Sequence, residues 1–146
     1  MTLSLGLLGP LEVISDGQTV RIVGVKERAV LALLALAAPR ALSTERLVEE
    51  LWGDELPESG SRPLRVLVSR LRKTLADSGE VIVTGPSGYC LAAAVETDVV
   101  RFEALSSRGR SELAAGHTEA AARFLREALG LFLSLIHILL TISDRV

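Results

Sequence analysis

Cysteine and histidine are scarce in this 146-residue chain, and their scarcity argues against disulfides and zinc sites. Cys90 is the single cysteine, so the chain forms no internal disulfide. The two histidines, His117 and His137, have no cysteine or histidine beside them at zinc-ligand spacing. We therefore expect no metal and no cofactor, and one free thiol suits a reducing cytoplasm.

Long apolar runs are missing as well. The longest, residues 129–142, covers about 14 positions, whereas a membrane-spanning helix needs about 20 apolar residues. The chain opens without the basic segment that begins a signal peptide. We expect a cytoplasmic chain with no membrane partner.

No group of residues has the composition of an active site. The acidic pairs Glu49-Glu50 and Asp54-Glu55 are typical of a solvated surface. The glycine-rich stretch 85–88 lacks the Lys-Ser/Thr of a phosphate-binding loop. We therefore expect that the chain is not an enzyme.

The first part of the chain has the pattern of a small antiparallel sheet followed by a helix. Residues 3–8, 11–15 and 19–23 are predicted strands, and Asp16-Gly17 is a strong signal for a tight turn. Residues 26–38 are a predicted helix that ends at Pro39. From Ala29 to Ala38 this helix is apolar all round, which favours burial on several sides.

Two more helices and a hairpin follow. Ser43 is a predicted N-cap for a helix that stops at Gly53, and a third helix is expected over residues 61–76. Residues 81–84 and 89–92 flank a glycine-rich turn and are predicted to form a β-hairpin.

Beyond Val95 the sequence becomes rich in alanine. Asp98 is a predicted cap for a helix that reaches residue 115, and Thr118 is a predicted cap for another that reaches Phe132. Two helices joined by a short turn form an αα-hairpin, the unit of a helical repeat.

The third helix separates its apolar residues from its basic ones. With 100° between successive residues, Leu64, Leu67, Val68, Leu71 and Leu75 fall on one side. The other side carries five positive charges and no acid, whereas the rest of the chain holds 11 basic and 18 acidic residues. Such a helix fits the major groove of DNA, where arginine binds guanine edges or phosphates.

The order of elements supports an interpretation as a DNA-binding protein. A helix, a loop, a basic helix and a hairpin with a glycine-rich tip follow one another as in a winged helix. The fold class we expect is an α+β winged helix, with an N-terminal antiparallel sheet, three helices and a C-terminal β-hairpin wing, followed by an all-α hairpin similar to tetratricopeptide repeats. An alternative remains open, in which the chain is a protein-interaction module whose basic helix docks an acidic partner.

The sequence resembles the Streptomyces antibiotic regulatory protein family over about residues 3–132. Four stretches carry the resemblance: Leu8-Gly9-Pro10-Leu11-Glu12-Val13; Lys26-Glu27-Arg28-Ala29-Val30-Leu31-Ala32-Leu33-Leu34; Leu51-Trp52-Gly53-Asp54; and Val68-Ser69-Arg70-Leu71-Arg72-Lys73 followed by Gly88-Tyr89. The family joins an OmpR-type winged helix to a bacterial transcriptional activator domain.

The resemblance implies a sequence-specific transcriptional activator of secondary-metabolite genes. Its partners would be double-stranded DNA at promoter direct repeats, RNA polymerase, and a second copy of the chain on the DNA. The implied contacts on the third helix are Arg62, Arg65, Val66, Ser69, Arg70, Arg72 and Lys73. Lys26 and Arg28, at the start of the first helix, are candidates for phosphate contact or for plain surface solvation. The wing, residues 84–88, has no basic residue, which departs from the arginine that such wings often place in the minor groove.

These observations divide the chain into three parts. Residues 1–95 are expected to form the winged-helix domain and residues 96–132 a shortened activator domain. Residues 133–146 are expected to be a non-native tail, because the stretch Leu133–Ile138 resembles a translated sequencing adapter and three of the six isoleucines follow position 135. The alternative is a genuine third helix of the repeat.

Overall fold

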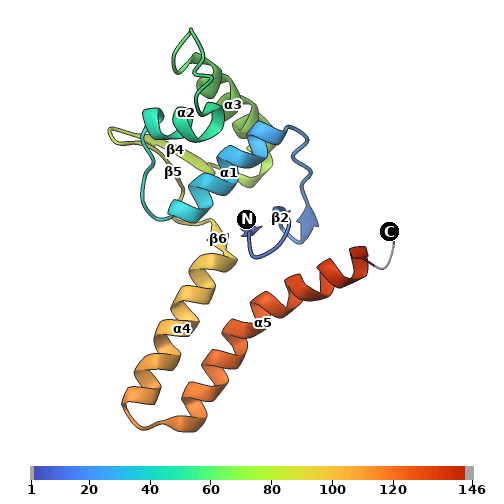
Figure 1. Ribbon diagram of the computed structural model, residues 1–146, viewed down its shortest axis with the longest axis vertical. Helices are drawn as coiled ribbons and strands as arrows, with labels where there is room; N and C mark the ends of the chain where they lie inside the picture. Colours follow the sequence, from blue (N-terminus) through green and yellow to red (C-terminus); the bar gives the residue numbers. More distant parts are fainter. Residues whose placement is uncertain (1, 144–146) are drawn as a thin grey trace. The chain divides into compact units, whose positions relative to one another are not determined.

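The computed structural model describes residues 2–143, and the side chains of residues 2–131. The chain divides into two compact units. The first unit contains the residues up to 5 and residues 11–96, and the second contains residues 6–10 together with the chain from 97 onward. Both α-helices and small sheets are present, so the fold is of the mixed α and β class (Figure 1).

A four-stranded sheet has the strand order β3-β2-β1-β6. Its strands are β1 (Leu3–Gly6), β2 (Glu12–Ser15), β3 (Gln18–Thr19) and β6 (Glu96–Thr97). Asp16 and Gly17 form the predicted turn between β2 and β3, with φ of 47° and 81°. The third strand was predicted over residues 19–23, and this was wrong: β3 is two residues long, and Val23 lies outside it with 79% of its surface exposed.

Three helices build the core of the first unit: α1 (Val25–Ala37), α2 (Thr44–Trp52) and α3 (Arg62–Thr74). The α1 helix packs against α2, α3 and β5 (Gly88–Leu91) (Figure 1). The expectation of burial on several sides is confirmed, because α1 meets three other elements and Leu31 and Leu34 are fully buried. The helix is not buried all round, since Leu36 is 58% exposed. A short 3-10 helix, η1 (Ala76–Ser78), follows α3.

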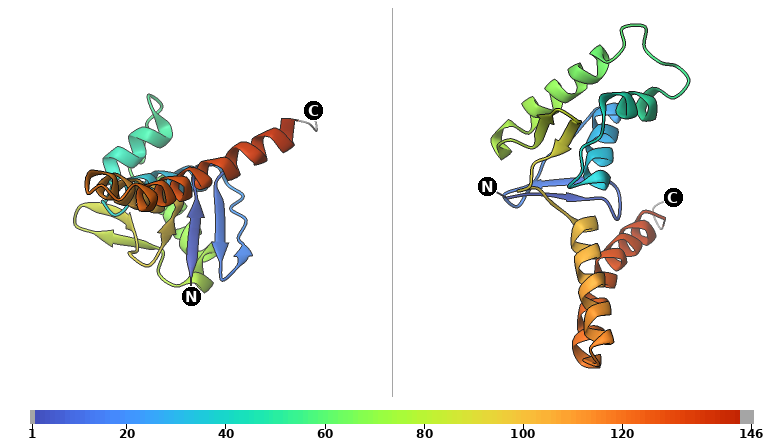
Figure 2. Two further views of the ribbon diagram at one scale, coloured as in Figure 1. Left: turned by 90° about the horizontal axis from the view of Figure 1, so that it is seen from below. Right: turned by 90° about the vertical axis from the view of Figure 1, so that its left-hand side faces the viewer.

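The hairpin of β4 (Ile82–Gly85) and β5 lies beside α3 (Figure 2, right). Gly85 pairs with Gly88 across its two-residue turn. The sequence did not predict that Leu42 joins the hairpin through two backbone hydrogen bonds with Tyr89, of 2.8 and 2.9 Å. Gly88 permits this approach, since its φ is +123° and a Cβ there would collide with the Leu42 carbonyl.

The second unit contains α4 (Asp98–Ala114) packed against α5 (Thr118–Ser143). Asp98 was predicted to cap α4, but the cap is Thr97, whose side chain accepts a hydrogen bond from the Val100 amide. Asp98 instead accepts hydrogen bonds of 2.8–2.9 Å from the amides of Leu7 and Leu8. The buried Gly109 lets Leu125 of α5 approach α4 closely.

The last helix is longer than predicted. It was expected to end at Phe132, but α5 continues to Ser143 as one helix, because the apolar pattern continues past position 132 without a proline. The side chains of the suspected tail, 133–146, lie outside the described residues. Among the residues that the structure describes, no helix is long and apolar enough to cross a membrane.

Candidate nucleic-acid interface

The α3 helix presents one apolar and one basic face. Pro63 stands in the first turn of the helix, where a missing backbone N–H breaks no helical hydrogen bond. Leu64, Leu67, Val68 and Leu71 are buried, as the periodicity of the sequence predicted. Burying four such side chains contributes roughly 6–12 kcal/mol before entropy is counted, so this packing fixes which face of α3 meets solvent.

The opposite face of α3 is exposed and basic. Among the described residues, no hydrogen bond or ion pair holds the side chains of Arg62, Arg65 or Lys73. Val66 lies among them with 43% of its surface exposed, and Ser69 is exposed as well. Three unpaired cations and an apolar side chain are therefore available to a ligand that combines negative charge with apolar groups.

Arg70 lies on the same face but has a partner within the protein. Its Nη1 is 3.5 Å from Oε1 of Glu27 on α1, and the Arg70 side chain remains 66% exposed. The guanidinium is therefore biased toward α1 without being buried. The sequence analysis did not identify Glu27 as a partner of Arg70. The signal that could have drawn attention to it is an acidic residue in the first turn of a helix that follows a glycine.

Arg72 is turned toward the hairpin. Its Nε and Nη2 donate hydrogen bonds of 3.2 and 2.9 Å to the Ile82 carbonyl, and Nη2 donates another of 2.7 Å to Thr84 Oγ1. The guanidinium also lies 6.0 Å from the centre of the Tyr89 ring. Arg72 therefore joins α3 to β4, and its place among the DNA contacts stays a prediction.

Of the two basic candidates on α1, Lys26 is held by other residues of the protein, as Arg72 is, whereas Arg28 is exposed. Lys26 Nζ donates a hydrogen bond of 3.0 Å to the Leu51 carbonyl and lies 4.9 Å from the centre of the Trp52 ring. It therefore fastens the start of α1 to the end of α2. Arg28 is exposed, and no hydrogen bond or ion pair with the described side chains holds it.

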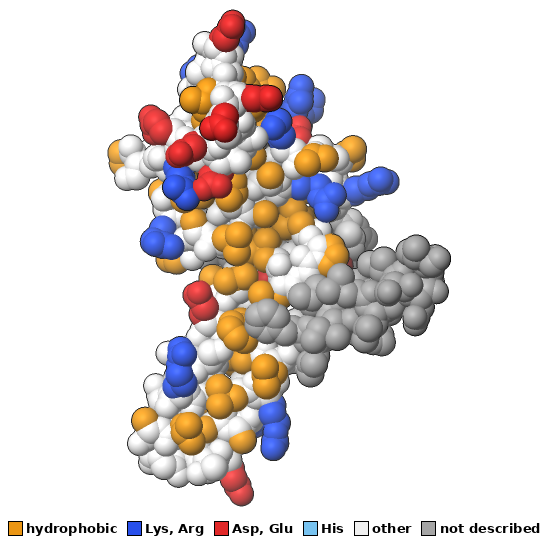
Figure 3. Space-filling view, in the orientation of Figure 1, with side chains coloured by type: hydrophobic (Ala, Val, Ile, Leu, Met, Phe, Trp, Pro, Cys, Tyr) orange, Lys and Arg blue, Asp and Glu red, His pale blue; other side chains and the backbone are white. Residues whose placement is uncertain are grey.

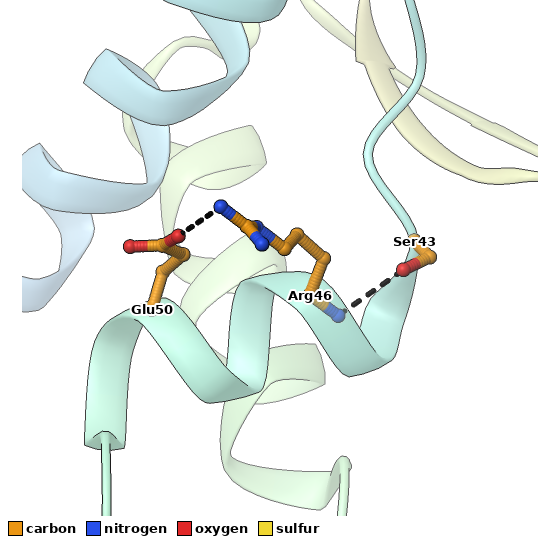
Figure 4. A network of polar contacts seen from close by, with 3 residues as sticks. All are labelled: Ser43, Arg46 and Glu50. Atoms are coloured by element: carbon orange, nitrogen blue, oxygen red, sulfur yellow. Dashed lines mark hydrogen bonds and ion pairs between the residues drawn. The ribbon is translucent and has the colours of Figure 1, made fainter.

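Acidic side chains gather elsewhere in the first unit, over α2 and the loop that follows it (Figure 3). A groove there is lined by Glu45, Glu49 and Asp54 together with Val48 and Leu56. The predicted N-cap of α2 is confirmed, since Ser43 Oγ accepts a hydrogen bond of 3.1 Å from the Arg46 amide. The Arg46 side chain pairs with Glu50 one turn later, at 2.6 Å (Figure 4). The α3 helix itself carries no acidic side chain, whereas α2 and its following loop carry several.

Potential metal-binding and reactive side chains lie apart from one another among the described residues. No group of three or more metal-binding side chains occurs among them. The Cys90 thiol is half-buried on β5, and His117 pairs with Glu112 at 2.7 Å on the surface of the second unit.

Comparison with known proteins assigns both units. The family model "Transcriptional regulatory protein, C terminal" matches residues 17–91, and the model "Bacterial transcriptional activator domain" matches residues 97–134. The transcriptional regulatory protein EmbR of Mycobacterium tuberculosis is 40% identical over 133 residues, which are 87% of this chain and 34% of EmbR. The regulatory protein AfsR of Streptomyces coelicolor is 36% identical over 132 residues, which are 89% of this chain and 13% of AfsR.

The regulatory protein DnrI of Streptomyces peucetius is 29% identical over 140 residues, which are 89% of this chain and 52% of DnrI. A solved structure of Mycobacterium tuberculosis EmbR in complex with a low-affinity phosphopeptide is similar at a TM-score of 0.80 and 35% identity, over 89% of this chain and 36% of that one. The chain thus spans about a third of the length of EmbR. These relatives are named as regulators and not as enzymes.

Both family models and the relatives agree with the resemblance that the sequence showed. The chain belongs to the transcriptional regulatory protein C-terminal family and, with its activator domain, to the regulators of the Streptomyces antibiotic regulatory protein type.

Proposed function

We propose that the first unit is a winged helix that binds double-stranded DNA sequence-specifically, with α3 as the recognition helix. The observation that carries this proposal is the basic face of α3, which holds five cations and no acid in a chain of net charge −2. An α-helix fits the major groove, and a concentrated positive face supplies the attraction to phosphate.

The side chains of α3 divide into two roles in this proposal. Arg65, Val66, Ser69 and Arg70 meet the base edges, where arginine binds guanine and Val66 contacts a thymine methyl group. Arg62, Lys73 and, from α1, Arg28 bind phosphates, because these side chains are free to follow the backbone. The β4–β5 hairpin is the wing in this scheme.

The wider function follows from family membership. The chain would activate secondary-metabolite genes from direct repeats near the promoter, beside a second copy of itself and in contact with RNA polymerase. The second unit would support activation, since it matches the activator domain.

A titration with two variants tests the proposal. A cognate duplex, selected from a random pool with the wild-type chain, and a scrambled duplex are titrated at several salt concentrations. The three cations assigned to phosphates, which are Arg28, Arg62 and Lys73, predict that log K falls with log salt with a slope of about −3.

The variants separate base reading from attraction to charge. Arg70→Ala should cost about 1–3 kcal/mol on the cognate site and much less on the scrambled one. Lys73→Ala should weaken both about equally and reduce the slope by about one. Equal losses for Arg70→Ala on both duplexes would make Arg70 a phosphate contact. If neither variant alters DNA binding, the basic face docks an acidic protein partner instead.

A further inference from the structure

The Glu27–Arg70 pair joins an acid of α1 to the basic face of α3. It is the single ion pair that the structure shows for α3 among the described side chains. Glu27 retains only 16% of its side-chain exposure, whereas Arg70 retains 66%. The carboxylate is therefore the fixed member of the pair and the guanidinium the movable one.

Gly24 leaves room for the Glu27 carboxylate at the start of α1. Glu27 is the third residue of α1, and its side chain folds back over Gly24, the N-cap residue. A Cβ at position 24 would collide with the Glu27 carboxyl group as it lies here, so a larger residue at this position would displace the end of that side chain. Negative charge is also favoured in the first turn of a helix, because the unpaired backbone N–H groups there carry partial positive charge.

The pair adds little to folding stability. An ion pair with an arginine this exposed is screened by water and contributes at most a small stabilisation. What it changes is the distribution of Arg70 orientations. Nη1 of the guanidinium lies toward Glu27, and the side chain as a whole stays 66% exposed, so its other N–H donors remain available to a ligand.

We propose that Glu27 is a specificity-determining residue that acts through Arg70, a proposal that rests on DNA binding by α3. Glu27 draws the guanidinium toward α1 and narrows the range of its orientations, so that binding a guanine edge costs Arg70 less conformational entropy. The same carboxylate offsets the attraction of Arg70 to phosphates at random sites, because its charge opposes theirs. Both effects raise the ratio of cognate to random affinity.

The test is the affinity ratio of Glu27→Gln for the cognate and scrambled duplexes. We expect the ratio to fall about two- to fivefold, the change that loss of an ion pair this exposed can supply. Affinity for the scrambled duplex should rise. In a set of duplexes with single base-pair changes, Glu27→Gln and Arg70→Ala should relax the preference at the same base pair, whereas a general loss of structure would relax all of them.

Two further variants show whether the change in the affinity ratio comes from the loss of any negative charge or from a disturbed start of α1. Glu50→Gln removes the same charge from the Arg46–Glu50 pair on α2 and should leave the ratio unchanged (Figure 4). Glu27→Asp keeps a negative charge in the first turn of α1 but shortens its reach toward Arg70, so the ratio should fall although the helix start is preserved. It also replaces Glu27→Gln if that variant does not fold.

The result that would overturn the proposal is an unchanged ratio for both Glu27 variants. An effect of Glu27→Gln that persists in full when Arg70 is already alanine would overturn it too, since Glu27 would then not act through Arg70. A wild-type chain that shows no preference between the two duplexes would instead refute DNA recognition itself.

Discussion

Arg72→Ala distinguishes a structural from a DNA-contacting arginine. The sequence placed Arg72 on the basic face, but the structure shows three hydrogen bonds from its guanidinium to β4. Two of them share the Ile82 carbonyl, and the third reaches the exposed Thr84 hydroxyl. Alanine would remove the connection between α3 and the hairpin.

The loss in folding free energy follows from these contacts. A hydrogen bond to a charged group contributes about 1.5–3 kcal/mol where it is well shielded. Because Arg72 is exposed and water can replace it at Thr84, we expect a total loss of about 1–2 kcal/mol. For a unit of this size that loss lowers Tm by roughly 4–15 °C.

The assay is urea unfolding followed by tryptophan fluorescence. Trp52, the single tryptophan, lies in the first unit and so reports on that unit. Lys73→Ala is the matched control: no described residue holds the Lys73 side chain, and its loss should change stability by less than about 0.5 kcal/mol. Arg72→Lys should recover less than half of the loss, because lysine lacks the planar fork.

Backbone amide exchange in β4 and β5 should also accelerate in Arg72→Ala. The reasoning would be refuted if Arg72→Ala unfolded at the wild-type urea concentration and nevertheless lost DNA affinity. Arg72 would then contact DNA directly, and its hydrogen bonds to β4 would carry no weight.

Three further outcomes are expected. Gly88→Ala should lower the free energy of unfolding by about 2–3 kcal/mol, because the new Cβ meets the Leu42 carbonyl. Gly85→Ala faces open space and should lower it by less than about 0.5 kcal/mol in the same thermal unfolding. The reverse order would contradict the close approach of Leu42 to Gly88. Asp98→Ala should lower the free energy of unfolding by about 1–3 kcal/mol and speed amide exchange at Leu7 and Leu8, whose N–H groups lose their acceptor. Unchanged exchange would show that this contact is absent in solution. Removal of residues 133–146 should leave DNA affinity within about threefold, roughly 0.7 kcal/mol, and a larger loss would show that this segment is structural.

Local signals in the sequence predicted the helices and turns closely. The apolar spacing of Leu64, Leu67, Val68 and Leu71 identified the buried side of α3, because a helix repeats every 3.6 residues whatever it packs against. Ser43 and the Asp16-Gly17 pair are equally local, since each acts on backbone within a few residues of itself.

Contacts between residues far apart in the sequence could not be predicted in this way. A helical projection places Arg72 on the exposed face but does not reveal that the Ile82 carbonyl lies within its reach. Asp98 was assigned to a local cap because its partners, Leu7 and Leu8, are some ninety positions away. The end of α5 was missed for another reason: an unusual composition was taken as the end of a helix whose apolar pattern continues.

The hydrogen bonds of Arg72 suggest a role for the β4–β5 hairpin, although its turn lacks basic residues. A wing without arginine has little to offer the minor groove, yet the β4–β5 hairpin is bound to α3 through Arg72 and to the start of α2 through Leu42. A hairpin fixed at both places restricts how far α3 can shift relative to α2. A shift of about 1 Å is enough to misplace a contacting side chain, so under the proposed function this restraint would favour base reading by α3. The hairpin would then contribute to specificity by positioning the recognition helix, without touching DNA itself.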